Sequence, residues 1–381
     1  MIFIAILYAF LCFFLIINWF LIDTRNQKKI QKKKNLIFTN DIDEYKVSVI
    51  VAARNEEKNI LYLLESLENQ TFEKKDFEVI IIDDNSEDNT TKIIKDFQKN
   101  SLLSIKILQS DKKIDYSPKK KALTLGINQA KGVLILTTDA DCIADENWIK
   151  TIWDFYKKTE AKLISSPVTF HQPSTFFEHF QVVDFASLVA SGAISLSLNV
   201  PNMANGANLA YTRSVFLAIE GYQNTPTIAS GDDEFLLAKI ANQFPNDVYF
   251  LKDKNAIITT KSSSNWNEFY KQRKRWASKW KYYKDLKTKI LAFVVFLFNF
   301  NVLLSIILFC SNLLSFYSFC WIIGLKFIPE FLFLMIISLF FEHKKSIFFI
   351  FLIQIIYPFY VLLFAFAGFG KEYEWKGRKL S

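Results

Sequence analysis

The sequence has few of the residues that build disulfide frameworks or histidine metal sites. Only 4 cysteines and 3 histidines occur among its 381 residues. Cys12, Cys310 and Cys320 lie in apolar runs and Cys142 lies beside an acidic pair, so neither a disulfide framework nor a zinc-binding spacing is present. No glycine-rich phosphate loop follows any of the expected strands. This absence argues against a dinucleotide oxidoreductase and against a P-loop enzyme.

The sequence also lacks the features of a cleaved signal peptide. Residues 1–22 carry no charge, and as a helix they would extend about 33 Å, enough to cross the apolar core of a bilayer. A signal peptide would have a basic start, a shorter apolar run and a small-residue cleavage motif, and all three are missing. We therefore expect residues 1–22 to be a retained transmembrane anchor.

Hydrophobic residues make up 51% of the chain, and 39 of the residues are phenylalanine. They gather in residues 1–22 and 290–369, whereas the middle has an ordinary soluble composition. Basic clusters follow the first stretch and precede the second, and positive charge beside a span marks the cytoplasmic side. We expect an integral membrane protein, in the inner membrane of a bacterial cell, with a cytoplasmic domain. These clusters also explain most of the net charge of +8, so nucleic acid is not an expected partner.

Charged residues interrupt the C-terminal apolar stretch near Lys326 and Glu330 and again at 342–346. Three or four spans would fit its length. The expected spans 290–311 and 347–369 carry no charge until their ends, which disfavours a transporter.

Strand-like and helix-like segments alternate between the apolar ends of the chain. Four short apolar runs have the length of buried strands: 47–53, 77–84, 105–110 and 133–139. Two intervening segments show helical spacing: 55–69 and 122–132. This order predicts an α/β domain with a parallel sheet covered by helices. Ligands of such sheets bind beyond the carboxyl ends of the strands, and six charged residues fall there: Arg54, Glu56, Asp83, Asp84, Asp139 and Asp141.

The segment LTTDADC places Asp139 and Asp141 one residue apart at the end of an expected strand. In an extended segment both side chains point to the same side, so both carboxylates can approach one cation. Mg²⁺ or Mn²⁺ is the expected partner, because a hard divalent ion takes one or two carboxylates together with phosphate oxygens of a nucleotide. A solvated acidic loop is the alternative for this pair considered alone.

Three segments in order resemble the family 2 glycosyltransferases with the nucleotide-sugar-binding type A (GT-A) fold. They are VSVIVAARNEEKNI, VIIIDDNSEDNT and TTDADC, and the resemblance covers about residues 46–280. It implies that Asp84 hydrogen-bonds uracil and that Lys121 lies near the diphosphate. It also implies that Asp139 and Asp141 hold nucleotide and metal. Three further residues are expected in the donor site: Ala52, Arg54 and Glu56. For Asp83 and Ser86 in the same turn, a capping role is the alternative.

Two further segments resemble the acceptor side of that family. In GDDEFLL, the match falls on Asp233 as the catalytic base, which removes a proton from the acceptor hydroxyl as it attacks the anomeric carbon. Inversion would then give a β-linkage from an α-linked sugar nucleotide. The alternative for these acidic residues is a capping role at the N-terminus of a helix, where negative charge is favourable. In NGANLAY, Asn205 and Asn208 are expected sugar contacts.

The segment QRKRW matches the family motif Q-x-x-R-W. In a helix, Gln272, Arg275 and Trp276 share one face. Arginine can donate two charge-assisted hydrogen bonds to a leaving diphosphate, and an indole offers a surface for an acceptor sugar. The motif occurs in β-glycan synthases and ceramide-type glucosyltransferases of the family. Three other basic residues are expected to lie on anionic lipid: Arg273, Lys274 and Lys279.

We therefore expect a membrane-bound inverting glycosyltransferase, with an α/β GT-A domain and transmembrane helices. It would transfer a sugar from a UDP-sugar to a lipid, lipid-linked or short glycan acceptor. A processive polysaccharide synthase with its own channel is the first alternative, and a non-catalytic membrane docking partner is the second. The expected parts are an anchor (1–22), a basic linker (23–45), the catalytic domain (46–270), an interfacial helix (271–289), a transmembrane region (290–369) and a tail (370–381).

Overall fold

The computed structural model describes residues 1–33, 44–111, 117–225, 231–278, 286–367, 373–375 and 378–380. The chain divides into two compact units. Unit 1 comprises Met1–Phe20, Gln172–Ser191 and Ser262–Ser381, and unit 2 comprises Leu21–His171 and Gly192–Lys261. Unit 2 therefore holds most of the expected catalytic domain.

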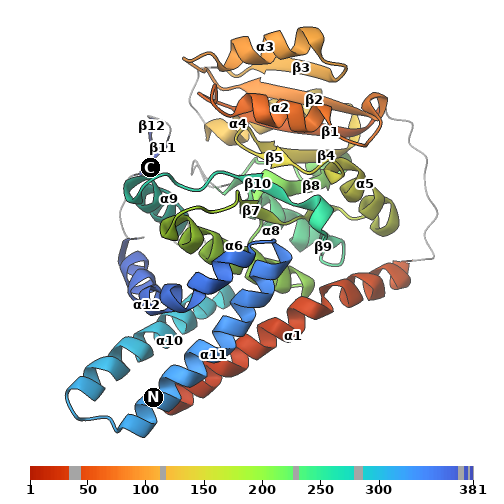
Figure 1. Cartoon of the computed structure of the whole chain (residues 1–381). Helices are drawn as coiled ribbons and strands as arrows, with labels where there is room; N and C mark the ends of the chain where they lie inside the picture. Colours follow the sequence, from red (N-terminus) through yellow and green to blue (C-terminus); the bar gives the residue numbers. More distant parts are fainter. Residues whose placement is uncertain are drawn as a thin grey trace. The chain divides into compact units, whose positions relative to one another are not determined.

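Unit 2 is built on a mixed, mostly parallel sheet of seven strands in the order β3-β2-β1-β4-β8-β6-β9 (Figure 1). The strands are β1 (Tyr45–Ala53), β2 (Phe77–Asp83), β3 (Ser104–Gln109), β4 (Gly132–Asp139), β6 (Leu163–Ser165), β8 (Leu209–Thr212) and β9 (Val248–Phe250). β8 is antiparallel to both neighbours. Strands β1 to β4 confirm the four predicted strands, and the expected parallel sheet is present.

Short helices lie between these strands in unit 2 (Figure 1). They are α2 (Ile60–Glu68), α3 (Thr90–Asn100), α4 (Pro118–Gln129), α5 (Trp148–Thr159), α7 (Arg213–Ala218) and α8 (Asp232–Gln243). A small second sheet has the order β5-β10-β7, formed by β5 (Ile143–Ala144), β10 (Ile258–Thr260) and β7 (Val168–Phe170). α4 packs closely on the main sheet, because a Cβ at Gly126 would lie 2.6 Å from Cδ1 of Ile82 and 2.9 Å from Cγ2 of Ile50.

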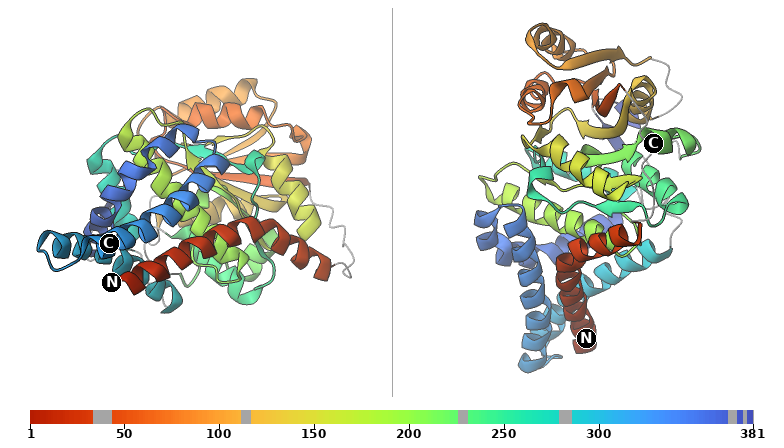
Figure 2. Two further views of the ribbon diagram at one scale, coloured as in Figure 1. Left: turned by 60° about the horizontal axis from the view of Figure 1, so that its bottom comes forward. Right: turned by 90° about the vertical axis from the view of Figure 1, so that its right-hand side faces the viewer.

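The apolar helices of unit 1 pack against one another (Figure 2). They are α10 (Leu286–Cys310), α11 (Phe316–Phe340) and α12 (Ile350–Ala367), and the first part of α1 (Ile2–Lys33) joins them. The ring of Tyr8 packs edge-on against Phe298 of α10, and Trp19 packs edge-on against Phe340 of α11. Unit 1 also contains α9 (Trp266–Ser278), the first part of α6 (Phe176–Ser197), and the β11–β12 pair (Tyr373–Trp375 and Arg378–Leu380).

Five described helices are long and apolar enough to cross a membrane: α1, α6, α10, α11 and the segment Lys344–Ala365 that contains α12. α6 was not expected. In its most apolar window 72% of the residues are buried in the protein, compared with 22–39% in the other four. α6 is therefore mainly an internal helix.

Lys326 and Glu330 do not interrupt the apolar region as we had expected. Both lie within α11, a single helix of 25 residues. Their side chains are one helical turn apart and form an ion pair of 2.7 Å, and Tyr8 of α1 donates a 2.6 Å hydrogen bond to Glu330. The charges neutralise each other inside the bundle, where Lys326 is 1% exposed, so the helix continues through them.

The expected linker 23–45 begins as helix, because α1 continues to Lys33. This basic part of α1 packs against β9 within unit 2. Asn26 donates a hydrogen bond to the carbonyl of Phe250, and Lys29 donates one to that of Val248. Some of the basic residues near the anchor therefore stabilise the fold of unit 2.

Candidate active site

The carboxyl ends of β1, β2 and β4 lie at one edge of the sheet. In the parallel register, Ala53 of β1 pairs with Asp83 of β2, and Ala52 pairs with Asp139 of β4. In the sheet, β2 and β3 lie on one side of β1, and β4 lies on the other side. A sheet of this type binds ligands where its strand order reverses, which here is between β1 and β4. Ala52, Arg54 and Asp139 flank this position.

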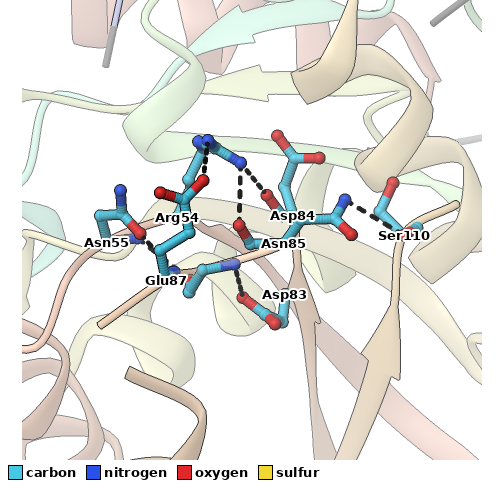
Figure 3. Close-up of polar contacts among 8 residues, drawn as sticks. Arg54, Asn55, Asp83, Asp84, Asn85, Glu87 and Ser110 are labelled. Atoms are coloured by element: carbon cyan, nitrogen blue, oxygen red, sulfur yellow. Dashed lines mark hydrogen bonds and ion pairs between the residues drawn. The ribbon is translucent and has the colours of Figure 1, made fainter. Parts of the chain in front are cut away.

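Arg54 holds the turn that follows β2 (Figure 3). Its Nη1 donates hydrogen bonds to the backbone carbonyls of Asp84 (2.8 Å) and Asn85 (2.9 Å). Its Nη2 forms a 3.3 Å ion pair with the exposed carboxylate of Glu87. Arg54 therefore fixes the backbone of the residue expected to contact uracil, and it is itself buried.

Asp83 and Asp84 have different surroundings. Asp83 accepts hydrogen bonds from the backbone N–H of Ser86 (3.1 Å) and from Oγ1 of Thr91 (3.0 Å), which is the capping role considered as the alternative. Figure 3 shows the Asp84 carboxylate pointing to the other side of the turn. Asp83 therefore stabilises the turn, and the Asp84 carboxylate points away from that of Asp83.

Glu56 is also buried and contributes to the local fold. Its carboxylate accepts a 2.7 Å hydrogen bond from Nδ2 of Asn59, and its backbone N–H donates to Oγ1 of Thr90. The neighbouring Glu57 N–H donates to Asp88 Oδ2 at 3.1 Å. These contacts join the loop after β1 to the start of α3.

Lys119, which was not among the expected site residues, lies among the acidic residues of the site. Its Nζ is 2.7 Å from Oδ1 of Asp139 and 3.4 Å from Oδ2 of Asp232. Burial by itself would lower the pKa of Lys119. The carboxylates of Asp139, Asp232 and Asp233 outweigh this effect and raise the pKa of Lys119 well above its ordinary value. Lys119 therefore carries a positive charge between β4 and α8.

Lys121, the lysine expected near the diphosphate, contacts Asp111. Its Nζ donates a 3.2 Å hydrogen bond to the carbonyl of Asp111 and lies 3.9 Å from its Oδ2. Residues of an α-helix are about 100° apart, so Lys119 and Lys121 project about 200° apart, from nearly opposite sides of α4.

Asp139 and Asp141 lie on a turn, which corrects the expectation of an extended segment. Asp139 is the last residue of β4, and its carbonyl accepts a 3.1 Å hydrogen bond from the N–H of Cys142, so the chain reverses there. Asp139 and Asp141 are nevertheless both half-buried, while Ala140 and Cys142 between and after them are fully buried. Burial and the adjacent carboxylates of Asp141 and Asp139 raise the pKa of the Cys142 thiol.

Asp233 lies in the first turn of α8, two residues after Gly231, whose φ of +84° suits glycine. Its two carboxylate oxygens accept hydrogen bonds from the N–H groups of Gly206 (3.1 Å) and Glu234 (2.8 Å). Gly206 approaches this acidic cluster closely, since a Cβ there would lie 3.0 Å from Oδ2 of Asp232. The backbone thus fixes the orientation of the Asp233 carboxylate.

Asn208 has a structural role, which corrects the expected sugar contact. Its side chain is fully buried, donates to the carbonyls of Pro167 (2.8 Å) and Ala256 (2.7 Å), and accepts from Nε1 of Trp148 (2.9 Å). No surface remains on it for a sugar. Asn205 is half-buried, and its Oδ1 accepts from the N–H of Ala207.

In unit 1, the Q-x-x-R-W segment is helical, as expected, and forms part of α9. Gln272, Arg275 and Trp276 are partly buried, and the indole of Trp276 lies 5.9 Å from the ring of Phe185. Arg273 is only 3% exposed and pairs with Asp184, so the expectation that it lies on lipid was wrong. Lys279 lies outside the described residues.

Asp139 and Asp141 supply carboxylate oxygens, the donor type that a hard divalent cation takes from a protein. Among the described residues, no three histidine, cysteine, aspartate or glutamate side chains form a group that could hold a metal ion. Asp139 and Asp141 are half-buried and lie on one turn at the carboxyl end of β4. Hard oxygen donors of this kind suit Mg²⁺ or Mn²⁺ when phosphate oxygens supply the other ligands.

Comparison with models of protein families supports this fold and covers the strands and acidic residues described above. The chain belongs to glycosyl transferase family group 2, whose model matches residues 134–366. The model of glycosyl transferase family 2 matches residues 48–206, which include β1, β2 and the acidic pair after β4. The protein is therefore a family 2 glycosyltransferase.

Two of the relatives are named as a synthase and a glycosyltransferase. Poly-β-1,6-N-acetyl-D-glucosamine synthase of Staphylococcus epidermidis is 25% identical over 261 residues, which cover 66% of this chain and 60% of the synthase. Poly(ribitol-phosphate) β-N-acetylglucosaminyltransferase TarS of Staphylococcus aureus is 35% identical over 105 residues, or 28% of this chain and 18% of TarS. The chain thus spans only part of the length of these relatives.

A solved structure shares the fold. The mannosyltransferase PcManGT from Pyrobaculum calidifontis, in complex with GDP-Man and Mn²⁺, superposes with a TM-score of 0.51. The match covers 92% of this chain and 98% of the other at 14% sequence identity. The α/β domain is therefore GT-A-like.

Proposed function

We propose that this protein is a membrane-bound inverting glycosyltransferase that moves a sugar from a UDP-sugar to a lipid, lipid-linked or short glycan acceptor. One observation carries the proposal. Asp139, at the carboxyl end of β4, and Asp232, which precedes Asp233 in α8, both contact Lys119, beside the edge of the sheet that carries Asp84. Acidic groups gathered at this edge suit a site for a nucleotide diphosphate with its cation.

The donor would bind along the edge formed by β1, β2 and β4. Asp84 would accept a hydrogen bond from uracil N–H, with its backbone held by Arg54. Asp139 and Asp141 would hold Mg²⁺ or Mn²⁺, which supplies positive charge to the diphosphate when bound. From α4, Lys119 is the lysine that lies beside Asp139 and would face the diphosphate, whereas Lys121, expected there from the sequence, contacts Asp111 on nearly the opposite side of the helix.

In the transfer step, an acceptor hydroxyl oxygen bonds to the anomeric carbon as the bond from that carbon to the diphosphate oxygen breaks. The hydroxyl proton goes to Asp233, and the electron pair of the broken bond leaves with UDP. Attack opposite the leaving group inverts the anomeric centre and gives a β-linkage from an α-linked donor. The N–H groups of Gly206 and Glu234 hold the carboxylate that receives the proton.

The Q-x-x-R-W residues would act on the leaving group and the acceptor. Arg275 has the planar fork that donates two hydrogen bonds to a diphosphate, and Trp276 offers an indole face to a sugar. Gln272 lies one turn away on the same helix.

Asp233→Asn tests the central step, because it keeps the shape of the side chain and removes its capacity to accept a proton. We expect UDP to bind with an affinity within about twofold of wild type, while sugar transfer falls by about 10³-fold or more. Near-normal turnover by Asp233→Asn would remove Asp233 from the role of base. Metal-dependent release of UDP by the wild type would also dismiss the non-catalytic alternative.

A processive polysaccharide synthase is the second candidate, favoured by the similarity to the poly-β-1,6-N-acetyl-D-glucosamine synthase. The two candidates differ in their products. Purified protein would be incubated with labelled UDP-sugars and membrane lipids, and the product partitioned between organic solvent and water. Label in the organic phase indicates a lipid product, and high-mass label in the aqueous phase indicates a polymer.

A further inference from the structure

Arg273, an unspecified position of the Q-x-x-R-W motif, forms a buried ion pair within unit 1. Its Nη2 lies 2.6 Å from Oδ2 of Asp184, which comes from α6. The side chains are 3% and 1% exposed. Tyr360 of α12 completes the group, since its hydroxyl donates a 3.3 Å hydrogen bond to the same carboxylate oxygen. Three helices from distant parts of the sequence therefore meet at Asp184.

The Arg273 guanidinium also contacts the motif tryptophan. Its Cζ lies 4.3 Å from the ring centroid of Trp276 and 4.9 Å from that of Phe269. Trp276 in turn packs against Phe185, the residue that follows Asp184. The indole is thus held by Arg273 and by Phe185, both of which depend on the position of α6.

Stability alone does not account for this pair. Removing two charges from water costs several kcal/mol per ion, and apolar residues of similar volume often replace a buried ion pair with no loss of stability. An ion pair, in contrast to an apolar contact, requires two particular charged atoms to lie within about 4 Å of each other. Arg273 can lie 2.6 Å from Asp184 and over the Trp276 ring at the same time only in a narrow range of helix rotations.

We propose that Arg273 is a positioning residue for sugar transfer, whose ion pair with Asp184 fixes the rotation of α9 and the orientation of the Trp276 indole. The inference rests on the proposed function and deepens it. Gln272, Arg275 and Trp276 would meet donor and acceptor, whereas Arg273 acts through them. Transfer requires reacting groups to be placed within a fraction of an ångström, and misplacement by 1 Å can lower the rate by about 10²-fold.

Four variants test the role: Arg273→Met, Asp184→Asn, the double variant carrying both, and Lys274→Met as the matched control on the same helix. Each single variant leaves one buried charge without its partner, so its Tm should fall. The double variant is neutral and nearly isosteric, so its Tm should return close to wild type. For each, kcat, the KM for the UDP-sugar and the Kd for UDP are measured in the same detergent.

The double variant separates positioning from folding. We expect its kcat to remain about tenfold or more below wild type despite the restored Tm, with the Kd for UDP within about twofold. Lys274→Met should match wild type. Recovery of kcat to within twofold of wild type in the double variant would overturn the inference, and so would unchanged kcat in Arg273→Met. Failure of the proposed function is distinguishable, because the wild-type protein itself would then show no sugar transfer.

Discussion

Lys119 of α4 lies 2.7 Å from Asp139 of β4, so a lysine ammonium occupies a place beside the acidic motif. The same ammonium is 3.4 Å from Asp232 at the start of α8. Like charges gathered from β4 and α8 would repel each other without it. Lys119 thus holds together the two halves of the candidate active site, in addition to any cation that binds with the donor.

Lys119→Met should make the acidic cluster more negative and more dependent on added cations. We expect its Tm without metal to fall below that of wild type, and Mn²⁺ to raise its Tm more than it raises the wild-type value. Thermal unfolding with and without Mn²⁺ measures both effects. Lys121→Met is the matched control from the same helix, where the lysine contacts Asp111. Equal responses of Lys119→Met and wild type to Mn²⁺ would contradict this role for Lys119.

Gly206→Ala should impair transfer more than nucleotide binding. The added Cβ would lie 3.0 Å from Oδ2 of Asp232, so this carboxylate must move by a few tenths of an ångström beside Asp233, whose Cβ would be 3.5 Å away. We expect kcat to fall by about tenfold or more, with the Kd for UDP nearly unchanged. Steady-state kinetics and UDP titration together check this expectation. A wild-type kcat in this variant would show that the position of Asp233 is not critical.

Asn208→Ala should destabilise the fold. It removes the partner of three buried groups: the carbonyls of Pro167 and Ala256 and the indole N–H of Trp148. Each buried group left without a hydrogen bond costs about 1–3 kcal/mol, so we expect a loss of about 3 kcal/mol or more. The half-buried Asn205 is the control, and Asn205→Ala should change Tm much less. Similar Tm values for the two variants would argue against the structural role of Asn208.

Asp88 should give a contribution to stability that disappears in acid. Burial alone would raise its pKa, but hydrogen bonds from the Thr90 hydroxyl and from the N–H groups of Thr90 and Glu57 outweigh this and lower the pKa of Asp88. A lowered pKa means that the stabilisation is present above the unfolded-state pKa of about 3.9 and is lost as the pH falls through the folded-state pKa.

Comparison of wild type with Asp88→Ala over a range of pH tests this contribution. We expect Asp88→Ala to have a lower Tm than wild type at pH 7, and the difference to shrink as the pH falls below about 4. Thermal unfolding at several pH values gives the difference directly. A difference that grows in acid would have the wrong sign for this explanation.

Much of the fold of unit 2 could be predicted, because short stretches of the sequence determine where its strands lie. Each of the strands β1 to β4 is a short apolar run, and polar residues follow their ends at the edge where sheets of this type bind ligands. The roles of Asp83 and Asp84 were harder to separate, since adjacent residues point to opposite sides of a strand and the sequence does not say which side faces the ligand.

The remaining features depend on partners that are distant in the sequence. Three consecutive lysines precede Ala122, and only the packing of α4 decides that Lys119 faces Asp139. From the sequence alone, Arg273 looks like a lipid-facing residue. Its buried partner, Asp184, lies on α6, far from it in the chain. Lys326 and Glu330 similarly appeared to interrupt the apolar region, although their spacing of four residues is the signal for an ion pair within one helix.

The most direct test of the central claim is metal-dependent formation of UDP from UDP-sugars by purified wild-type protein and by Asp139→Asn. Our account predicts that wild type, supplied with Mn²⁺ and native membrane lipids as acceptors, forms UDP from at least one UDP-sugar and stops when EDTA is added. Asp139→Asn should form UDP at least about 10²-fold more slowly. Equal rates for wild type and Asp139→Asn, or no UDP from any UDP-sugar, would contradict the account.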